Sequence, residues 1–243
     1  MLALALIRTC AAICFLILYG VLLGPFFILQ AMLSGSVRIL YPFCVGGAQI
    51  GLRIAGVTPR AEGLENIPRG VCLFVSNHVS NVDPPAIIGR IPGRVAFLAK
   101  RELFRIPLFG TAMRLGRFIP VHRADPAAAR ASVRLARRYM REGISYLIFA
   151  EGTRSLDGRL GEFKRGSFLL AIESGAPVVP ITIVGTGRIL PRGAFAVRPG
   201  IARIIFHPPV NASEYSPATR KDLADRVRSA IAGALPPEQQ PAR

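Results

Sequence analysis

A histidine and an aspartate five residues apart are the first candidates for chemistry in this sequence. The stretch NHVSNVD (77–83) follows an apolar run, VCLFV (71–75), and holds one of the chain's three histidines. The carboxylate of Asp83 could accept a hydrogen bond from one ring nitrogen of His78, which would leave the other nitrogen free to take a proton from a hydroxyl group. Asp83 is also followed by proline and is therefore a good helix N-cap, so the stretch alone leaves both roles open.

The spacing of this pair indicates which elements must position it. Residues on one face of a helix are three or four apart, so His78 and Asp83 do not share a helix face. The spacing instead suits a histidine in the loop after a strand and an aspartate at the start of the next helix. Such loops, at the carboxyl ends of strands, are where α/β sheets place their sites.

Short apolar runs alternating with helical stretches follow residue 60. The runs are rich in β-branched and aromatic residues, which predicts buried strands. Three stretches between them have helical patterns, and in the first Asp125 is expected to cap, Pro126 to take the first position and Gly143 to end the helix. The predicted strands are 71–75, 95–99, 116–121, 145–150, 177–184 and 202–207, and the predicted helices are 125–143, 164–175 and 219–235. This alternation predicts an α/β fold with a layered sheet flanked by helices.

The N-terminal part of the chain is apolar enough to enter a membrane. Residues 9–33 carry no charge, and their length suffices to cross a hydrocarbon core of roughly 30 Å. A signal peptide has a shorter apolar run of about 7–15 residues, so we expect an uncleaved membrane segment. A second, weaker apolar stretch, 39–57, is broken by Pro42 and several glycines, and Gly24-Pro25 interrupts the first. The two could form a helical hairpin that dips into one leaflet, or the first could span.

The distribution of arginines predicts the orientation of the chain. Arg38, Arg53 and Arg60 follow the first apolar segment, whereas only Arg8 precedes it. By the positive-inside tendency, a single span would leave the C-terminal domain in the cytoplasm, facing the inner membrane. We therefore divide the chain into a membrane-associated segment (1–57), a catalytic domain (58–235) and a disordered tail (236–243).

The composition favours a protein that acts at an anionic lipid surface. The chain of 243 residues is 51% hydrophobic and carries 31 Lys+Arg against 14 Asp+Glu, a net charge of +17. Apolar and cationic character together suit an anionic bilayer or an anionic, lipid-like substrate. Nucleic-acid binding is the rival explanation of the charge, but the chain has no zinc-finger spacing, heptad zipper or aromatic RNA-binding signature, so no specific nucleic-acid partner is expected.

Other chemistries lack their residue patterns. The four cysteines form no CxxC pair or Cys/His cluster, and the histidines are isolated, so neither structural zinc, a disulfide framework nor a catalytic metal is predicted. The chain also has no Gly-x-Ser-x-Gly elbow, which argues against a serine hydrolase.

Three further stretches resemble known sequence blocks. They are GRFIPVHR (116–123), FAEGTRS (149–155) and PVVPITI (177–183). Together with the H-x-x-x-x-D stretch they occur in the order found in the glycerolipid acyltransferase family, and the sequence resembles that family, its bacterial 1-acyl-glycerol-3-phosphate acyltransferases in particular, over residues 60–210. This chain has Ala150 where the family usually has proline, and His122 where it usually has Asp or Asn.

The resemblance implies roles for the residues in these blocks. The family's base and its orienting carboxylate correspond to His78 and Asp83. A phosphate on the acceptor needs cations, for which arginine's fork geometry is best suited. The residues expected to bind the acceptor are Lys100, Arg123, Glu151, Gly152, Thr153 and Arg154, and Pro180 is expected to shape the channel for the acyl donor, although a plain core strand explains it nearly as well. Gly152 would let the backbone approach a ligand closely, and Glu151 is expected to orient Arg154 or to bind the acceptor.

The expected activity is therefore acyl transfer without a covalent intermediate. The resemblance implies transfer of a fatty acyl group from acyl carrier protein or coenzyme A to the free hydroxyl of 1-acyl-glycerol-3-phosphate, giving phosphatidate, on a layered mixed α/β sheet flanked by helices. No cofactor is expected beyond the thioester co-substrate. Two alternatives stay open: another lysolipid acceptor, such as a lyso-ornithine lipid, and a membrane-surface binding protein that keeps the fold without the activity.

Overall fold

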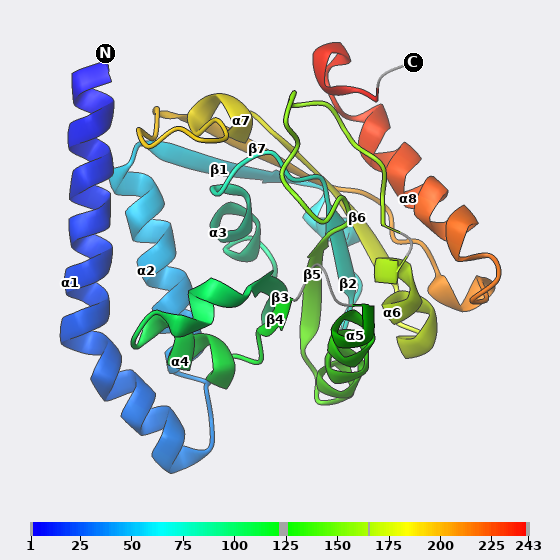
Figure 1. Cartoon of the computed structure of the whole chain (residues 1–243), viewed down its shortest axis with the longest axis horizontal. Coiled ribbons are helices and arrows are strands. Elements are labelled where there is room, and N and C mark those ends of the chain that lie inside the picture. The colour runs from blue at the N-terminus through cyan, green and yellow to red at the C-terminus, as the bar shows by residue number, and fades with distance from the viewer. Residues whose placement is uncertain (1, 122–125, 165, 242–243) are drawn as a thin grey trace.

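A seven-stranded mixed sheet forms the centre of the structure, a computed structural model that describes residues 2–121, 126–164 and 166–241 (Figure 1). The strand order is β1-β7-β6-β2-β5-β3-β4. All neighbouring strands pair in parallel except β6 and β7, which are antiparallel. The strands are β1 (Val57–Glu62), β2 (Leu73–Ser76), β3 (Val95–Lys100), β4 (Ile119–Val121), β5 (Ser145–Phe149), β6 (Val178–Val184) and β7 (Gly200–Phe206). The predicted mixed α/β fold is confirmed.

Helices cover both faces of the sheet (Figure 1). On one face lie α2 (Leu40–Ile54) and α3 (Asp83–Ile88), and on the other lie α5 (Pro126–Arg141), α6 (Gly166–Ser174) and α8 (Arg220–Gly233). The central strand β2 is consequently buried on both sides, which explains why its sequence is a continuous apolar run with no alternation. The shorter helices are α4 (Phe109–Leu115), α7 (Thr186–Ile189) and the 3₁₀ turns Leu64–Asn66, Arg101–Arg105, Ala212–Glu214 and Pro237–Gln239.

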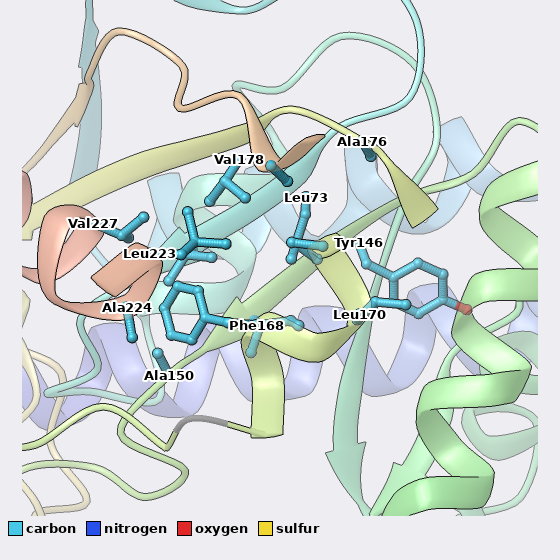
Figure 2. Packing of buried hydrophobic residues seen from close by; sticks show 14 of the residues in the cluster. Leu73, Tyr146, Ala150, Phe168, Leu170, Ala176, Val178, Leu223, Ala224 and Val227 are labelled. Atoms are coloured by element: carbon cyan, nitrogen blue, oxygen red, sulfur yellow. The ribbon is translucent and has the colours of Figure 1, made fainter. Parts of the chain in front are cut away.

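The core between the sheet and helices α6 and α8 supports the loop that follows β5. Phe168 of α6 is fully buried and packs in one cluster with Leu223 of α8 and Leu73 of β2. Figure 2 shows this ring beside Ala150, the residue that follows β5. The helices on this face are thus packed against the point at which the chain leaves the sheet toward Glu151.

The six predicted strands are present as β2–β7, and one strand was not predicted. Strand β1 has the sequence VTPRAE and lies at the edge of the sheet, where it pairs only with β7. Its residues alternate between buried or half-buried and exposed, and Pro59 within it suits an edge strand. It therefore lacks the apolar run that identifies the inner strands.

The three predicted helices are present as α5, α6 and α8. Pro126 is the first residue of α5, where its missing N–H group has no cost. Gly143, with φ +88°, follows the end of that helix. The predicted cap, Asp125, lies outside the described residues.

The N-terminal segment forms two helices that pack against each other (Figure 1). Helix α1 (Leu2–Ser34) continues through Pro25, and α2 begins two residues before Pro42. The ring of Phe43 stacks on Tyr19 at 4.3 Å and on Phe27 at 4.1 Å between ring centroids. The two apolar stretches are therefore a helical hairpin, and the proline of the second lies in the first turn of α2, where it is tolerated.

Helix α1 is long and apolar enough to cross a membrane. Only 17% of its most apolar 18-residue window is buried inside the protein, so it is not a core helix. Its exposed side chains include Leu22, Phe26 and Leu33, which are 71%, 67% and 80% exposed. This surface favours association of the protein with a membrane.

The end of the chain differs from the predicted disordered tail. Pro237–Gln239 form a 3₁₀ turn, and the Gln239 carbonyl accepts a hydrogen bond from the Leu160 N–H at 2.9 Å. Glu238 forms an exposed ion pair with Arg188 at 3.1 Å. The prediction rested on composition alone, and it was wrong for these residues because the adjacent prolines restrict the backbone and the loop around Leu160 supplies partners.

Candidate active site

Most of the described predicted site residues lie at or beyond the carboxyl ends of three adjacent parallel strands, β2, β5 and β3. Ser76 of β2 pairs with Phe149 of β5, so His78 and Glu151 each lie two residues beyond that pair. Lys100, the last residue of β3, pairs with Val121, the last residue of β4. Since parallel strands end at the same edge of a sheet, the fold collects these separate stretches along one edge.

Asp83 holds the histidine and the loop that carries it. Its Oδ2 atom lies 2.8 Å from Nδ1 of His78 and accepts backbone N–H bonds of 2.8 Å from Val79 and from Ser80. Asp83 is completely buried and lies in the first turn of α3, whose N-cap makes no side-chain hydrogen bond. The carboxylate therefore does not cap its own helix but turns back onto the histidine loop, which resolves the ambiguity of the sequence.

The imidazole presents its second nitrogen away from the aspartate. Since the Asp83 carboxylate is an acceptor, we assign the hydrogen to Nδ1, which leaves Nε2 as the basic nitrogen. Nε2 has no hydrogen-bond partner in the described part of the chain, and the His78 side chain is 14% exposed. The ring stacks on Phe149 with centroids 4.0 Å apart and planes 24° apart. This arrangement fixes the ring and leaves Nε2 able to accept a proton, which is the geometry that general-base catalysis requires.

The backbone of His78 is held from the loop after β5. Its N–H donates to Oε1 of Glu151 at 2.8 Å, and its carbonyl accepts from the Ser155 N–H at 2.8 Å. The preceding residue is fixed as well, because the Asn77 side chain exchanges two hydrogen bonds of 2.8 and 2.9 Å with the backbone of Ile183. The histidine loop is therefore attached to both neighbouring strands, β5 and β6.

Glu151 is a buried carboxylate bonded to backbone on both sides. Its Oε2 atom accepts the Gly161 N–H at 3.0 Å, while Oε1 accepts the His78 N–H. Burial raises the pKa of the Glu151 carboxyl, and these two N–H groups partly oppose the rise. Within the described residues Glu151 makes no ion pair with Arg154, and its predicted role in binding the acceptor stays a prediction.

The loop after β5 makes the predicted tight turn. Gly152 has φ +74°, a conformation that favours glycine, and its N–H donates to the Phe149 carbonyl at 2.9 Å. A Cβ atom at Gly152 would come within 2.8 Å of the Lys164 side chain. Thr153 is exposed, while Arg154 is half-buried.

A hollow of about 440 Å³ opens within this loop. Arg154 and Thr153 line it together with Arg159, which sequence reasoning did not single out, and the carboxylates of Glu151, Asp157 and Glu162 line it too. The arginines give the hollow two cationic groups beside the histidine loop, and the carboxylates restrict where an anion could bind. Arg159 could not be identified from the sequence because it lies outside the four sequence blocks that resemble the known family.

The remaining predicted residues lie farther along the sheet or inside it. Lys100 is exposed and 3.8 Å from Glu102. Arg123 lies outside the described residues. Pro180 is buried in β6 opposite Val75 of β2, and its predicted part in a donor channel is not tested by this position. No group of three or more His, Cys, Asp or Glu side chains suited to a metal occurs among the residues that the structure describes.

Much of the chain is similar in sequence to known proteins. Residues 58–184 match the family model described as acyltransferase. A chloroplastic 1-acyl-sn-glycerol-3-phosphate acyltransferase of Brassica napus is 37% identical over 177 residues, which cover 72% of this chain and 50% of the relative. A protein of the same name from Pseudomonas aeruginosa is 32% identical over 177 residues, 72% of this chain and 68% of the relative. The chain thus spans about half the length of the plant relative.

A solved structure resembles the whole fold. The 1-acyl-sn-glycerophosphate acyltransferase PlsC from Thermotoga maritima superimposes with a TM-score of 0.75 at 27% sequence identity. The match covers 92% of this chain and 95% of that protein. The similarity therefore extends beyond the residues of the family model to most of the chain, including part or all of the N-terminal helices.

Proposed function

The chain belongs to the acyltransferase family, and from this premise we propose that it transfers a fatty acyl group from a thioester to the free hydroxyl of 1-acyl-sn-glycerol-3-phosphate, giving phosphatidate. The observation that carries the proposal is the His78–Asp83 pair, with Nδ1 bound to the carboxylate and Nε2 without a partner among the described residues. The names of the relatives support the choice of acceptor.

The reaction needs one base and proceeds without an enzyme-bound acyl group. His78 Nε2 takes the proton of the acceptor hydroxyl. The hydroxyl oxygen attacks the thioester carbonyl carbon at the same time, forming a C–O bond and a tetrahedral oxyanion. The oxyanion collapses, the C–S bond breaks, and the thiolate leaves with the proton from the imidazolium. Asp83 stabilises the imidazolium between these steps. No cofactor is required beyond the thioester itself, which comes from acyl carrier protein or coenzyme A.

The apolar N-terminal helices suit an enzyme whose acceptor and product reside in a bilayer. The exposed side chains of α1 supply the apolar surface, and the net charge of +17 favours anionic lipid. We place the protein at the inner membrane with the catalytic domain in the cytoplasm, where both thioester donors are available.

An acceptor panel tests the proposed activity. The purified protein is assayed in mixed micelles with lysophosphatidate, a lyso-ornithine lipid and lysophosphatidylcholine. Each acceptor is tested with a labelled acyl group carried either by acyl carrier protein or by coenzyme A. We expect kcat/KM for lysophosphatidate to exceed the others by at least about tenfold, since a phosphate monoester carries more negative charge than the phosphodiester or carboxylate of the other two head groups and makes stronger charge-assisted bonds with arginine. A higher value for the lyso-ornithine lipid would favour the alternative acceptor, and lipid binding with no turnover of any acceptor would favour a binding protein.

Replacement of Arg154 by alanine tests the phosphate site. We expect the KM for lysophosphatidate to rise about 10- to 100-fold with little change in kcat, because a charge-assisted hydrogen bond is lost from acceptor binding. The Arg154 carbonyl, which accepts a 2.9 Å bond from Arg192, stays in place. The matched control is Arg226→Ala, which removes an exposed arginine of α8 that has no ion pair within the described chain. An unchanged KM in Arg154→Ala would remove this residue from acceptor binding.

A further inference from the structure

Glu151 makes the contacts of a structural link, although the sequence suggested an acceptor ligand. Only 9% of the residue is exposed. One oxygen accepts the N–H of His78 and the other the N–H of Gly161, which lies ten residues farther along the same loop. A buried carboxylate that joins two backbone segments fixes their separation, and one of these segments carries the base.

Gly161 is itself held by the C-terminal helix. The guanidinium Nε of Arg228, on α8, donates to the Gly161 carbonyl at 3.0 Å. The neighbouring Leu160 is buried, and its N–H donates to the Gln239 carbonyl in the turn after α8. A Cβ atom at Gly161 would lie 3.1 Å from Oε2 of Glu151, closer than an ordinary contact, so the Glu151 carboxylate and the Gly161 backbone are packed tightly together.

These bonds form one continuous chain from α8 to the base. Arg228 binds the carbonyl of Gly161, the N–H of Gly161 binds Glu151, and Glu151 binds the N–H of His78. We infer that α8 positions the catalytic histidine through this chain, so that Glu151 and Arg228 are positioning residues of the acyl transfer. The kinetic test of this inference rests on the proposed function. The hydrogen-bonded chain itself does not depend on that function.

The charges of the site favour this role over direct contact with the acceptor. The acceptor's phosphate is an anion, and a buried carboxylate repels it. Each Glu151 oxygen already accepts a backbone N–H bond, which a ligand would have to share or displace. The His78 ring depends on the loop position, because its contacts with Asp83 and Phe149 come from different elements and are satisfied together in one geometry.

The kinetic test compares an isosteric variant of Glu151 and a truncating variant of Arg228 with matched controls. Glu151→Gln keeps the shape but replaces one acceptor oxygen with an NH₂ group, which faces a backbone N–H. We expect kcat to fall about 10- to 100-fold, with the acceptor KM within about twofold of wild type, since small displacements of a catalytic group are costly. Arg228→Gln, which removes the bond to Gly161, is expected to lower kcat about 3- to 10-fold. The double variant should lose less than the product of the two effects, because both interrupt the same chain.

The controls remove similar groups away from this chain. Glu62→Gln alters a glutamate whose two oxygens also accept two N–H bonds, of 2.7 and 2.8 Å, from Arg203 at the far edge of the sheet. Arg226→Gln alters an exposed arginine two residues from Arg228 on the same helix. Both should retain wild-type kcat. Thermal melting of all five variants, the double variant included, shows whether a loss of kcat reflects unfolding.

A chemical measurement decides the positioning role independently of turnover. The rate at which diethyl pyrocarbonate modifies His78, followed by mass spectrometry of its peptide, is expected to rise severalfold in Glu151→Gln and Arg228→Gln and to stay unchanged in the controls. An unchanged modification rate would overturn the inference, as would a raised acceptor KM at unchanged kcat, which identifies an acceptor ligand. Multiplicative effects in the double variant would overturn the link through Arg228. Failure of the wild type to acylate any lysolipid would contradict the proposed function only, and the modification rates would still decide the positioning role.

Discussion

His78→Ala is expected to lower kcat by about 10²- to 10⁴-fold, the range that a positioned general base contributes. The substitution removes the only described group at this site whose free nitrogen can take the proton of the acceptor hydroxyl, because Nδ1 is bound to Asp83 and Nε2 has no protein partner in the described chain. Initial rates with saturating lysophosphatidate and acyl donor measure the effect. The acceptor KM should change much less, since the phosphate is bound elsewhere.

The structure provides a control for the integrity of this variant. Alanine keeps the backbone N–H and carbonyl that bind Glu151 and Ser155, so the loop is expected to stay in place and the melting temperature to change little. The lost ring leaves a space against Phe149, and free imidazole added to the assay should restore part of the activity. A variant that retains more than a third of the wild-type rate would exclude His78 as the base.

The part of the site that can be predicted from the sequence consists of contacts between two side chains. His78 and Asp83 could be recognised because the pair combines two chemically distinctive residues at a spacing that suits a loop followed by a helix. The apolar runs before them and before Glu151 identified the two strands, and parallel pairing of those strands then brings the two loops together. Residue type, spacing and strand pattern were sufficient here.

The contacts that were not predictable have a backbone atom as one partner. Glu151 binds the N–H groups of His78 and Gly161, and Arg228 binds the carbonyl of Gly161. Every residue except proline carries a backbone N–H, so no residue type marks the partner, and only the folded geometry selects it. The same reason explains the tail, where the Gln239 carbonyl, and not its side chain, anchors the segment.

The glycines and prolines of the N-terminal segment show a different limit. Gly47 and Gly51 are among the glycines that interrupt the second apolar stretch in the sequence, yet both lie within α2 and face α1. A Cβ atom at Gly51 would lie 3.1 Å from the Leu16 side chain, and one at Gly47 would collide with the Tyr19 ring. Small residues let two apolar helices approach closely, so the same letters that weaken an isolated helix stabilise a helix pair. Sequence alone does not say which partner, if any, is present.

Asp83→Asn is the second variant with a large expected effect, a fall in kcat of about 10²- to 10⁴-fold, comparable with loss of the orienting aspartate in other His–Asp enzymes. The amide oxygen can still accept the N–H groups of Val79 and Ser80, so the loop should persist. The negative charge that stabilises the imidazolium is lost. The amide nitrogen must also occupy the position of Oδ1, which is buried with no partner among the described residues, or that of Oδ2, where it would face two N–H groups.

Asp222→Asn is the control for Asp83→Asn. It removes a negative charge from a helix N-terminus without removing a bond to His78. Asp222 lies in the first turn of α8, as Asp83 does in α3, but it is exposed and far along the chain from the base. Both substitutions remove a negative charge that interacts favourably with a helix N-terminus, an effect of about 0.3–1 kcal/mol on stability. If the bond of Asp83 to His78 is what matters for catalysis, Asp83→Asn loses turnover while Asp222→Asn keeps it. Equal activities of the two variants would show that Asp83 matters only as a negative charge at the N-terminus of α3. His78 would then act without an orienting partner.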